Sequence, residues 1–203
     1  MSTRLNSGRF LGFPIAINHR LYLSIMAREH PMVERRTDHA TRKRVSEMST
    51  EEMQQALLVS ERTGLPNKRA FDEREPSAWV AMCDVNGLKT LNDVFGYSAG
   101  DILIRKLAEV LTSVKVDAYH DKGDEFLCRG SSYQELNQKL SRAQRLLQEK
   151  PFAVRGMDGR TTSVPGADFC FGIGTNLEEA ERSLKHQKEL RKWRFTEWQC
   201  PSS

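Results

Sequence analysis

The apolar run from Trp79 to Cys83 ends directly in an acid, Asp84. A short continuous apolar run of this kind is typical of a buried strand. Its carboxylate is then expected at the C-terminal edge of a sheet, which is where ligands bind in open α/β sheets. This one feature predicts both a fold class and the place of a site.

The segments that follow this strand alternate between helical and strand-like patterns. Apolar residues recur at helical spacing over 88–95 and again over 103–111. Two short strand-like runs, 114–119 and 126–128, then flank the polar turn 121–124. These runs predict a hairpin with acids at its tip.

Two capping boxes indicate where later helices begin. Ser132 and Glu135 are spaced to cap a long amphipathic helix that ends near residue 149. A last strand is expected over 168–173, and Thr175 with Glu178 is expected to cap the final helix.

Residues 156–166 are rich in glycine and proline and are expected to be loop. The predicted order is therefore strand, two helices, hairpin, helix, strand and helix. This order specifies an α/β sandwich with a central mixed sheet flanked by helices.

The 203-residue chain is long enough for one domain and a short appendage. We expect a basic N-terminal arm or linker at 1–48, one domain at 49–195 and a tail at 196–203. A capping box of Ser49 and Glu52 begins the domain's first helix.

Charge is distributed unevenly between the arm and the domain. Residues 1–50 hold nine Lys and Arg against four acids, whereas the other 153 residues hold 22 against 23. The chain's net charge of +4 is too small to indicate a nucleic-acid-binding protein. A basic arm can touch nucleic acid or a membrane surface, but a solvated basic face explains it more simply.

Four scattered cysteines without a Cys-x-x-Cys pair favour neither a zinc site nor a disulfide framework. No stretch approaches the length of a membrane span, and no signal peptide is recognisable. We therefore expect a cytoplasmic protein without a membrane span.

Three acids are the candidate catalytic groups: Asp84 at the strand end, and Asp124 and Glu125 at the hairpin tip. Carboxylates gathered at a sheet edge suit Mg²⁺, which prefers oxygen ligands and often shares them with substrate phosphates. On spacing alone, solvated turn residues are the simpler interpretation.

Longer motifs change that balance. The stretches Thr63–Phe71, Asp84–Asp101 and Gly123–Phe126 and a closing lysine, Lys188, occur in this order. Together they resemble the GGDEF diguanylate cyclase family, over residues of about 50–193. That family combines a TGL-N-RR-F segment, D-x-D-x-x-K-x-x-N-D-x-x-G-x-x-x-G-D, a GG(D/E)EF hairpin and a closing A-K helix. The resemblance implies the palm-like sheet of nucleotide cyclases and polymerases.

The resemblance also implies metal ligands and reacting groups. Asp84, the backbone carbonyl of Val85 and Asp124 would hold Mg²⁺ or Mn²⁺. Glu125 would lie near the metal and the attacking 3′-hydroxyl. These three acids, Asp84, Asp124 and Glu125, are thus the expected catalytic residues.

Substrate contacts follow in the same way. Asn92 and Asp101 match the positions that bind the guanine edge, and the backbone amides near Gly87 and Leu88 would face the phosphates. In the last helix, Lys188 matches the lysine of the closing motif.

Some positions depart from the family pattern. Lys192 stands where an Arg usually contacts the triphosphate, and His120 stands where an Arg is usual. Lys122 replaces the first glycine of the hairpin motif. Lys122 and Gly123 can occupy the centre of a type II turn, where only the glycine needs a positive φ. A turn that needs a positive φ at Lys122 would instead cost about 1 kcal/mol. The lysine side chain then either helps to hold a triphosphate or blocks the second substrate.

We accordingly expect a diguanylate cyclase that condenses two GTP molecules to cyclic di-GMP and two pyrophosphates. The symmetry of this product requires two GTP-loaded copies to meet, so a homodimer is expected during catalysis. One alternative is a degenerate GGDEF-like module that binds GTP or a related nucleotide and acts through protein partners. Another is a palm-type enzyme with a different nucleotide product.

Overall fold

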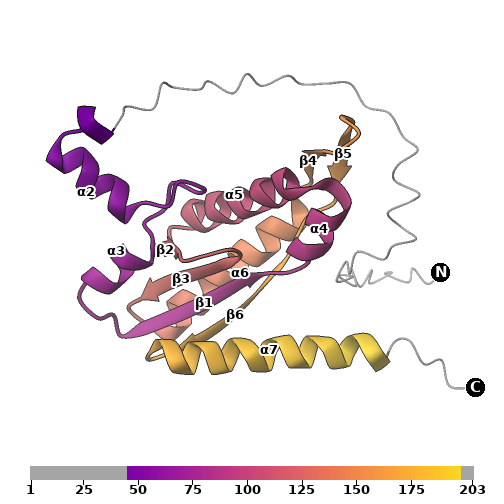
Figure 1. The fold of residues 1–203 in the computed structure, drawn as a ribbon. Coiled ribbons are helices and arrows are strands. Elements are labelled where there is room, and N and C mark those ends of the chain that lie inside the picture. Colours follow the sequence, from indigo (N-terminus) through magenta and orange to yellow (C-terminus); the bar gives the residue numbers. More distant parts are fainter. Residues whose placement is uncertain (1–44, 198–203) are drawn as a thin grey trace, which may run out of the picture. The chain divides into compact units, whose positions relative to one another are not determined.

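The computed structural model describes residues 45–197 of the chain, whose elements are labelled in Figure 1. In chain order these elements are η1 (Val45–Glu47), α2 (Thr50–Leu58), α3 (Lys68–Glu73), β1 (Trp79–Val85), α4 (Leu88–Phe95), α5 (Tyr97–Ser113), β2 (Asp117–His120), β3 (Glu125–Gly130), α6 (Tyr133–Glu149), β4 (Phe152–Arg155), β5 (Thr161–Val164), β6 (Phe169–Gly174) and α7 (Leu177–Glu197). Residues 1–44 of the expected arm lie outside the described residues, and so do residues 198–203 of the expected tail. The division into arm, domain and tail stays a prediction.

The central sheet has four strands in the order β2-β3-β1-β6, and its three ladders are all antiparallel. The prediction of a mixed sheet is therefore corrected. β1 and β2 run in the same direction, but the hairpin inserts β3 between them, so the two parallel strands are never neighbours. This is the arrangement of a split βαβ unit.

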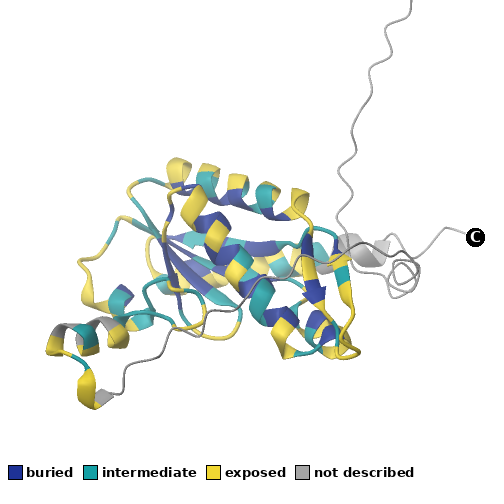
Figure 2. Cartoon of the chain, turned by 90° about the horizontal axis from the view of Figure 1, so that it is seen from above, coloured by how far each residue is buried: buried dark blue, intermediate teal, exposed yellow. Residues whose placement is uncertain are grey.

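Helices cover both faces of this sheet, which confirms the predicted α/β class. On one face Phe71 of α3 and Ala180 of α7 join Val80, Tyr119 and Leu127 of the strands in one buried cluster. α5 and α6 lie on the other face (Figure 1). Figure 2 shows the buried residues concentrated between these layers.

α7 approaches the sheet most closely at Gly172 of β6. A Cβ atom at this position would lie 2.1 Å from the backbone nitrogen of Leu184 and 2.3 Å from the carbonyl oxygen of Ala180. Since real Cβ atoms do not approach backbone so closely, only glycine allows this packing. The contact fixes the position of the helix that carries Lys188.

The predicted capping residues are only partly correct. Ser49 and Glu52 form the full capping box at α2. Ser132 caps α6, but Glu135 bonds the Ser131 hydroxyl instead of the Ser132 amide.

At α7 the predicted cap of Thr175 and Glu178 is wrong by one residue. Asn176 accepts the Glu179 amide, and Glu179 reaches back to Thr175. The side-chain acceptor at the start of α7 is therefore Asn176, one position later than predicted, while the Glu179 carboxylate bonds Thr175.

A second, two-stranded sheet was not predicted. β4 and β5 form a hairpin across residues that we expected to be mainly loop. Only Phe152, Val154 and Val164 of these strands are buried, so the apolar alternation is too short to stand out in the sequence. None of the helices within residues 45–197 is long and apolar enough to cross a lipid bilayer.

Candidate active site

The carboxyl end of β1 meets the tip of the β2–β3 hairpin. In the β1–β3 ladder Asp84 lies opposite Glu125, and the Val85 N–H donates to the carbonyl of Asp124 at 3.3 Å. The N–H and C=O of a strand residue point to the same side, so the Val85 carbonyl also faces the hairpin. Four residues that were expected to share a site therefore lie together.

Lys188 of α7 reaches the same point from the helix that packs against β1 and β6. Its Nζ lies 2.6 Å from Oδ2 of Asp84, whose side chain is only 16% exposed. Burial raises the pKa of Asp84, the ion pair with Lys188 lowers it, and the nearby Asp124 raises it. The net shift is upward, because the burial of this carboxylate outweighs its ion pair with Lys188.

Glu125 is the second acid whose pKa is raised. Burial is the main cause, Lys122 opposes it, and Asp121, Asp124 and Asp84 add to it. Lys122 Nζ lies 3.8 Å from Glu125 Oε2, but the lysine side chain is 77% exposed. Because this pair is largely solvated, Lys122 is free to turn toward another anion.

The hairpin turn differs from the expected one. Glu125 N–H donates to the Lys122 carbonyl at 2.9 Å, so the turn is Lys122–Glu125 and Gly123 is its first central residue. Gly123 has φ = 56°, whereas Lys122 is not among the residues with positive φ. The turn is therefore neither a type II turn centred on Lys122 and Gly123 nor one that needs a positive φ at Lys122. A lysine at the corner of the turn causes no backbone strain.

The His120 side chain bridges the loop after α2 and the hairpin turn. Its Nδ1 lies 2.6 Å from the Ser60 hydroxyl and its Nε2 lies 3.2 Å from the Gly123 carbonyl. A carbonyl only accepts, so Nε2 carries the proton and Nδ1 accepts from Ser60. Burial lowers the pKa of His120, which favours this neutral form.

The expected phosphate contacts lie where β1 leads into α4. Gly87 is the N-cap of α4, with φ = 77° and no side-chain cap. The amides of Gly87 and Leu88 therefore lie at the positive end of a helix, which suits an anion.

The two expected guanine contacts lie on adjacent helices. The Asn92 Oδ1 is buried without a hydrogen-bond partner and lies so close to Gly100 that a Cβ there would be 2.0 Å away. Asp101, the next residue, pairs with Arg62, whose Nε lies 3.2 Å from Asp101 Oδ1. An orphaned buried acceptor beside a carboxylate fits a ligand that donates hydrogen bonds.

Three charged residues near the site were missed by the sequence analysis: Arg62, Asp168 and Arg191. Arg191 of α7 forms an ion pair with Asp168, and Asn86 faces the same guanidinium at 2.9 Å once its amide is oriented to accept. Arg191 is three residues beyond Lys188, so helical spacing alone could have placed it on the same side. The side chain of Lys192 lies outside those that the structure describes.

The residues present fit a hard cation. Asp84, Asp124 and the Val85 carbonyl offer oxygen ligands at one point, which is the donor set that Mg²⁺ and Mn²⁺ prefer. Within residues 45–197 no three His, Cys, Asp or Glu side chains form a ready metal cluster. The Lys188 ammonium beside Asp84 shows that a cation can lie next to this carboxylate.

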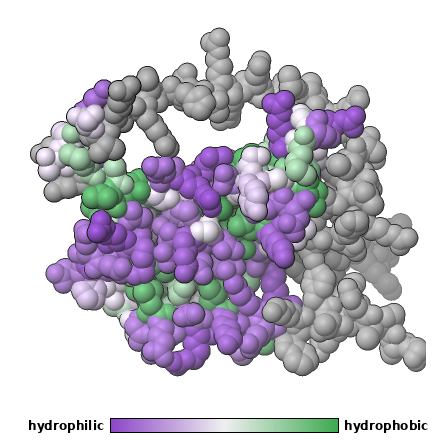
Figure 3. All heavy atoms as spheres, viewed as in Figure 1, coloured by the Kyte–Doolittle hydropathy of each residue, from purple (hydrophilic) through white to green (hydrophobic). Residues whose placement is uncertain are grey.

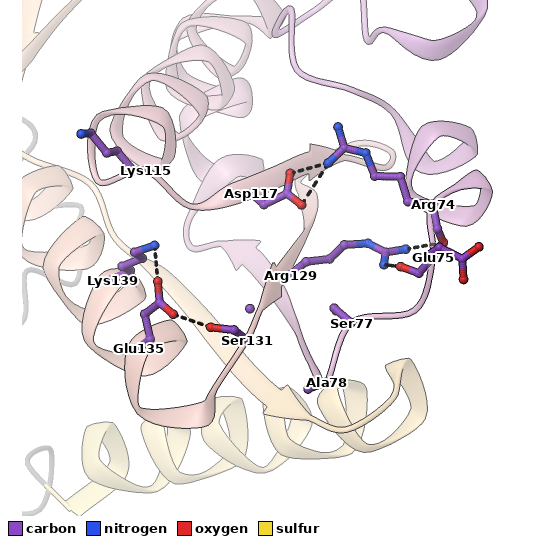
Figure 4. Close-up of a pocket in the computed structure, with 11 residues that line it drawn as sticks. Arg74, Glu75, Ser77, Ala78, Lys115, Asp117, Arg129, Ser131, Glu135 and Lys139 are labelled. Atoms are coloured by element: carbon purple, nitrogen blue, oxygen red, sulfur yellow. Dashed lines mark hydrogen bonds and ion pairs between the residues drawn. The ribbon is translucent and has the colours of Figure 1, made fainter.

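A separate pocket of about 690 Å³ lies at the opposite ends of β2 and β3. Its charged side chains are mostly paired, Arg74 with Asp117 and Lys139 with Glu135 (Figure 4). It contains none of the predicted site residues. The face of the described part shown in Figure 3 is mostly hydrophilic, with hydrophobic residues gathered near α2 and near the β4–β5 hairpin.

Comparisons with known proteins agree with these observations. The family model described as "Diguanylate cyclase, GGDEF domain" matches residues 60–167. The diguanylate cyclase DgcZ of Escherichia coli (strain K12) is 34% identical over 77 residues, which cover 32% of this chain and 26% of that protein. An uncharacterised protein from the hutH 5′ region of Streptomyces griseus is 34% identical over 73 residues, which cover 30% of each chain. The matches thus span less than a third of these curated relatives.

Solved structures share the fold. The diguanylate cyclase SiaD of Pseudomonas aeruginosa, crystallised with its activator SiaC, has a TM-score of 0.55 at 23% identity, over 68% of this chain and 60% of that one. The GGDEF domain of YfiN (TpbB) from the same organism has a TM-score of 0.54 at 20% identity, over 65% and 89%. At these identities the likeness concerns the fold.

Proposed function

This chain belongs to the GGDEF-domain family of diguanylate cyclases, and from that premise we propose that it condenses two GTP molecules to cyclic di-GMP and two pyrophosphates. One observation carries the proposal. Asp84, Asp124 and Glu125 meet at one end of the sheet, and Lys188 enters the same place from α7. Nucleotidyl transfer needs this combination of carboxylates and a cation.

Asp84, Asp124 and the Val85 carbonyl would hold Mg²⁺ or Mn²⁺. When bound, such a cation neutralises charge on the α-phosphate and lowers the pKa of the attacking 3′-hydroxyl. Glu125 has the raised pKa of a carboxylate that accepts a proton readily. We therefore assign to Glu125 the removal of the hydroxyl proton.

Cations and amides would hold the triphosphate. Lys188 leaves Asp84 to bind phosphate oxygens, and Lys192 extends the same role along α7. The amides of Gly87 and Leu88 face the phosphates from the start of α4. The exposed ammonium of Lys122 is within reach of Glu125 and adds a further phosphate contact.

Two copies of the chain would cooperate in each reaction. Each domain offers one set of groups for GTP, and the product is symmetric, so two loaded domains must face each other. Exposed apolar side chains on α2, those of Met53 and Leu57, are suitable for such a contact. We propose a homodimer during catalysis.

The test is incubation of the pure chain with GTP and Mg²⁺, with the products separated by chromatography. We expect cyclic di-GMP, and we expect it to disappear in Asp84→Ala. GTP binding without turnover, with turnover restored by Lys122→Gly, would instead indicate a degenerate module that acts through partners. A different nucleotide product would indicate another palm-type reaction. If the chain neither binds GTP nor forms a product, the site assignment is refuted.

A further inference from the structure

Arg62 links two parts of the candidate site. It lies in the loop between α2 and α3, with Nε 3.2 Å from Oδ1 of Asp101. Its Nη1 also donates to the carbonyl of Gly123 in the hairpin turn, at 3.4 Å. Arg62 and Asp101 are both less than half exposed, at 42% and 40%. The guanidinium is therefore held at the base-binding position and is still open to a ligand.

The hydrogen-bonding groups of Asp101 and Asn92 leave part of guanine unmatched. The Asp101 carboxylate only accepts, and the buried Oδ1 of Asn92 is an acceptor that lacks a partner. Both suit the N1–H and N2–H₂ donors of the base. Guanine also presents two acceptors, O6 and N7, for which these oxygens offer nothing.

Arg62 supplies the missing donors. A guanidinium has five N–H groups in a planar fork, and the contacts with Asp101 and Gly123 use only part of them. Asp101 keeps its second carboxylate oxygen for the base. The pair thus presents donors and acceptors side by side.

We propose that Arg62 determines base specificity by donating to O6 and N7 of guanine beside Asp101. The inference rests on the proposed function, because it takes GTP as the ligand of this site. Adenine also presents N7 but carries an amino donor where guanine has O6, so the guanidinium faces a donor there and loses the two-point contact. Arg62 therefore selects guanine over adenine.

A second interpretation of the same contact has the opposite sign. If Arg62 only covers Asp101, the base must displace it, and removing Arg62 would strengthen nucleotide binding. If Arg62 only supports the loop, removing it would weaken binding of both bases equally. The ratio of guanine to adenine affinity separates these interpretations.

The experiment is calorimetric titration with α,β-methylene GTP and α,β-methylene ATP in Mg²⁺, since neither analogue can undergo transfer at the α-phosphate. In Arg62→Met we expect the guanine analogue to bind about 5- to 150-fold more weakly, and the affinity for the adenine analogue to change much less. Arg62→Lys, which keeps the charge but not the fork, should lie between these values. Arg74→Met removes an exposed pair with Asp117 at 3.2 Å far from the site and should change neither affinity.

Equal or tighter binding of the guanine analogue by Arg62→Met would overturn the inference, and so would equal losses for both analogues. A wild-type chain that binds neither analogue would refute both the inference and GTP as its ligand. A chain that binds the guanine analogue selectively through Arg62, yet makes no cyclic di-GMP from GTP, would refute the proposed reaction alone.

Discussion

The ion pair between Lys188 and Asp84 is the most informative contact to remove. Lys188→Met keeps the length and the apolar stem of the side chain but deletes the ammonium that lies 2.6 Å from Asp84. The Asp84 carboxylate then remains mostly buried and close to Asp124. Burial and the charge of Asp124 both raise its pKa. We expect the variant to unfold more easily and, without nucleotide, to bind a divalent cation more tightly.

The magnitude follows from how far the pair is buried. Hydrogen bonds to charged groups contribute about 1.5–3 kcal/mol when buried, and fully exposed ion pairs contribute about 0–1 kcal/mol. Asp84 is 16% exposed and Lys188 is 39% exposed, so this pair lies between those limits. We expect the free energy of unfolding to fall by about 1–2 kcal/mol. The same energy no longer opposes a cation at Asp84, which corresponds to about 5- to 30-fold tighter binding.

The assay is a Mn²⁺ titration of the nucleotide-free chain, with free Mn²⁺ followed by electron paramagnetic resonance. Urea unfolding of the same samples gives the change in stability. Lys106→Met is the matched control, because it removes an exposed ion pair of the same 2.6 Å length, with Glu109 on α5. Its Mn²⁺ affinity should equal that of the wild type. Unchanged or weaker Mn²⁺ binding by Lys188→Met would show that Asp84 is not the cation position.

Three further predictions concern stability and pH. Gly172→Ala should destabilise the chain by about 2–3 kcal/mol in urea unfolding, because the new Cβ meets the backbone of Leu184. Gly123→Ala, where the space is open but φ = 56°, should destabilise it by only about 1 kcal/mol. Equal losses of stability in the two variants would contradict the close packing at Gly172. Burial lowers the pKa of His120 in the folded chain, so its imidazole is protonated at higher pH in the unfolded chain than in the folded one. The free energy of unfolding therefore falls as the pH drops below about 6.5. His120→Gln should reduce that loss between about pH 7.5 and 5.5 in urea unfolding, and an unchanged slope would exclude His120 as the cause. Burial raises the pKa of Glu125, so its ionised form opposes folding at neutral pH. Glu125→Gln should therefore raise the urea midpoint, and it should lower cyclic di-GMP formation by at least about 100-fold. A lower urea midpoint would show that the charge of Glu125 stabilises the fold.

The parts of the site that could be predicted are those with local patterns. The apolar run before Asp84 predicts β1, and the polar turn before Glu125 predicts the hairpin. Both expectations depend only on neighbours in sequence. The register that places Asp84 opposite Glu125 does not, because it is determined by where the turn begins and by how β3 pairs with β1.

The parts that could not be predicted are contacts between distant segments. Arg62 reaches Asp101 from a loop before α3, and no periodicity connects the two positions. His120 shows a similar limit: its ring holds Ser60 and Gly123 through contacts that a sequence pattern does not encode. The prediction of a mixed sheet was wrong for the same reason. A local pattern predicts β2 and β3 but does not show that β3 lies between β2 and β1.

These tertiary contacts suggest how a nearly neutral domain would hold the polyphosphate that we propose as its substrate. Residues 51–203 carry 22 Lys and Arg against 23 acids, so no general excess of positive charge attracts the substrate. Instead, four acids at or next to the site are each paired with a cation from another part of the chain or turn. The pairs are Lys188–Asp84, Lys122–Glu125, Arg62–Asp101 and Arg191–Asp168.

Such pairing keeps partly buried charges compensated before any ligand arrives, which avoids the cost of an isolated charge. It also predicts an exchange of partners on binding. A phosphate that takes Lys188 leaves Asp84 without its cation, and a divalent ion that takes Asp84 leaves Lys188 without its anion. Each ligand should therefore favour the other, and Mn²⁺ affinity measured with and without α,β-methylene GTP should differ more in the wild type than in Lys188→Met.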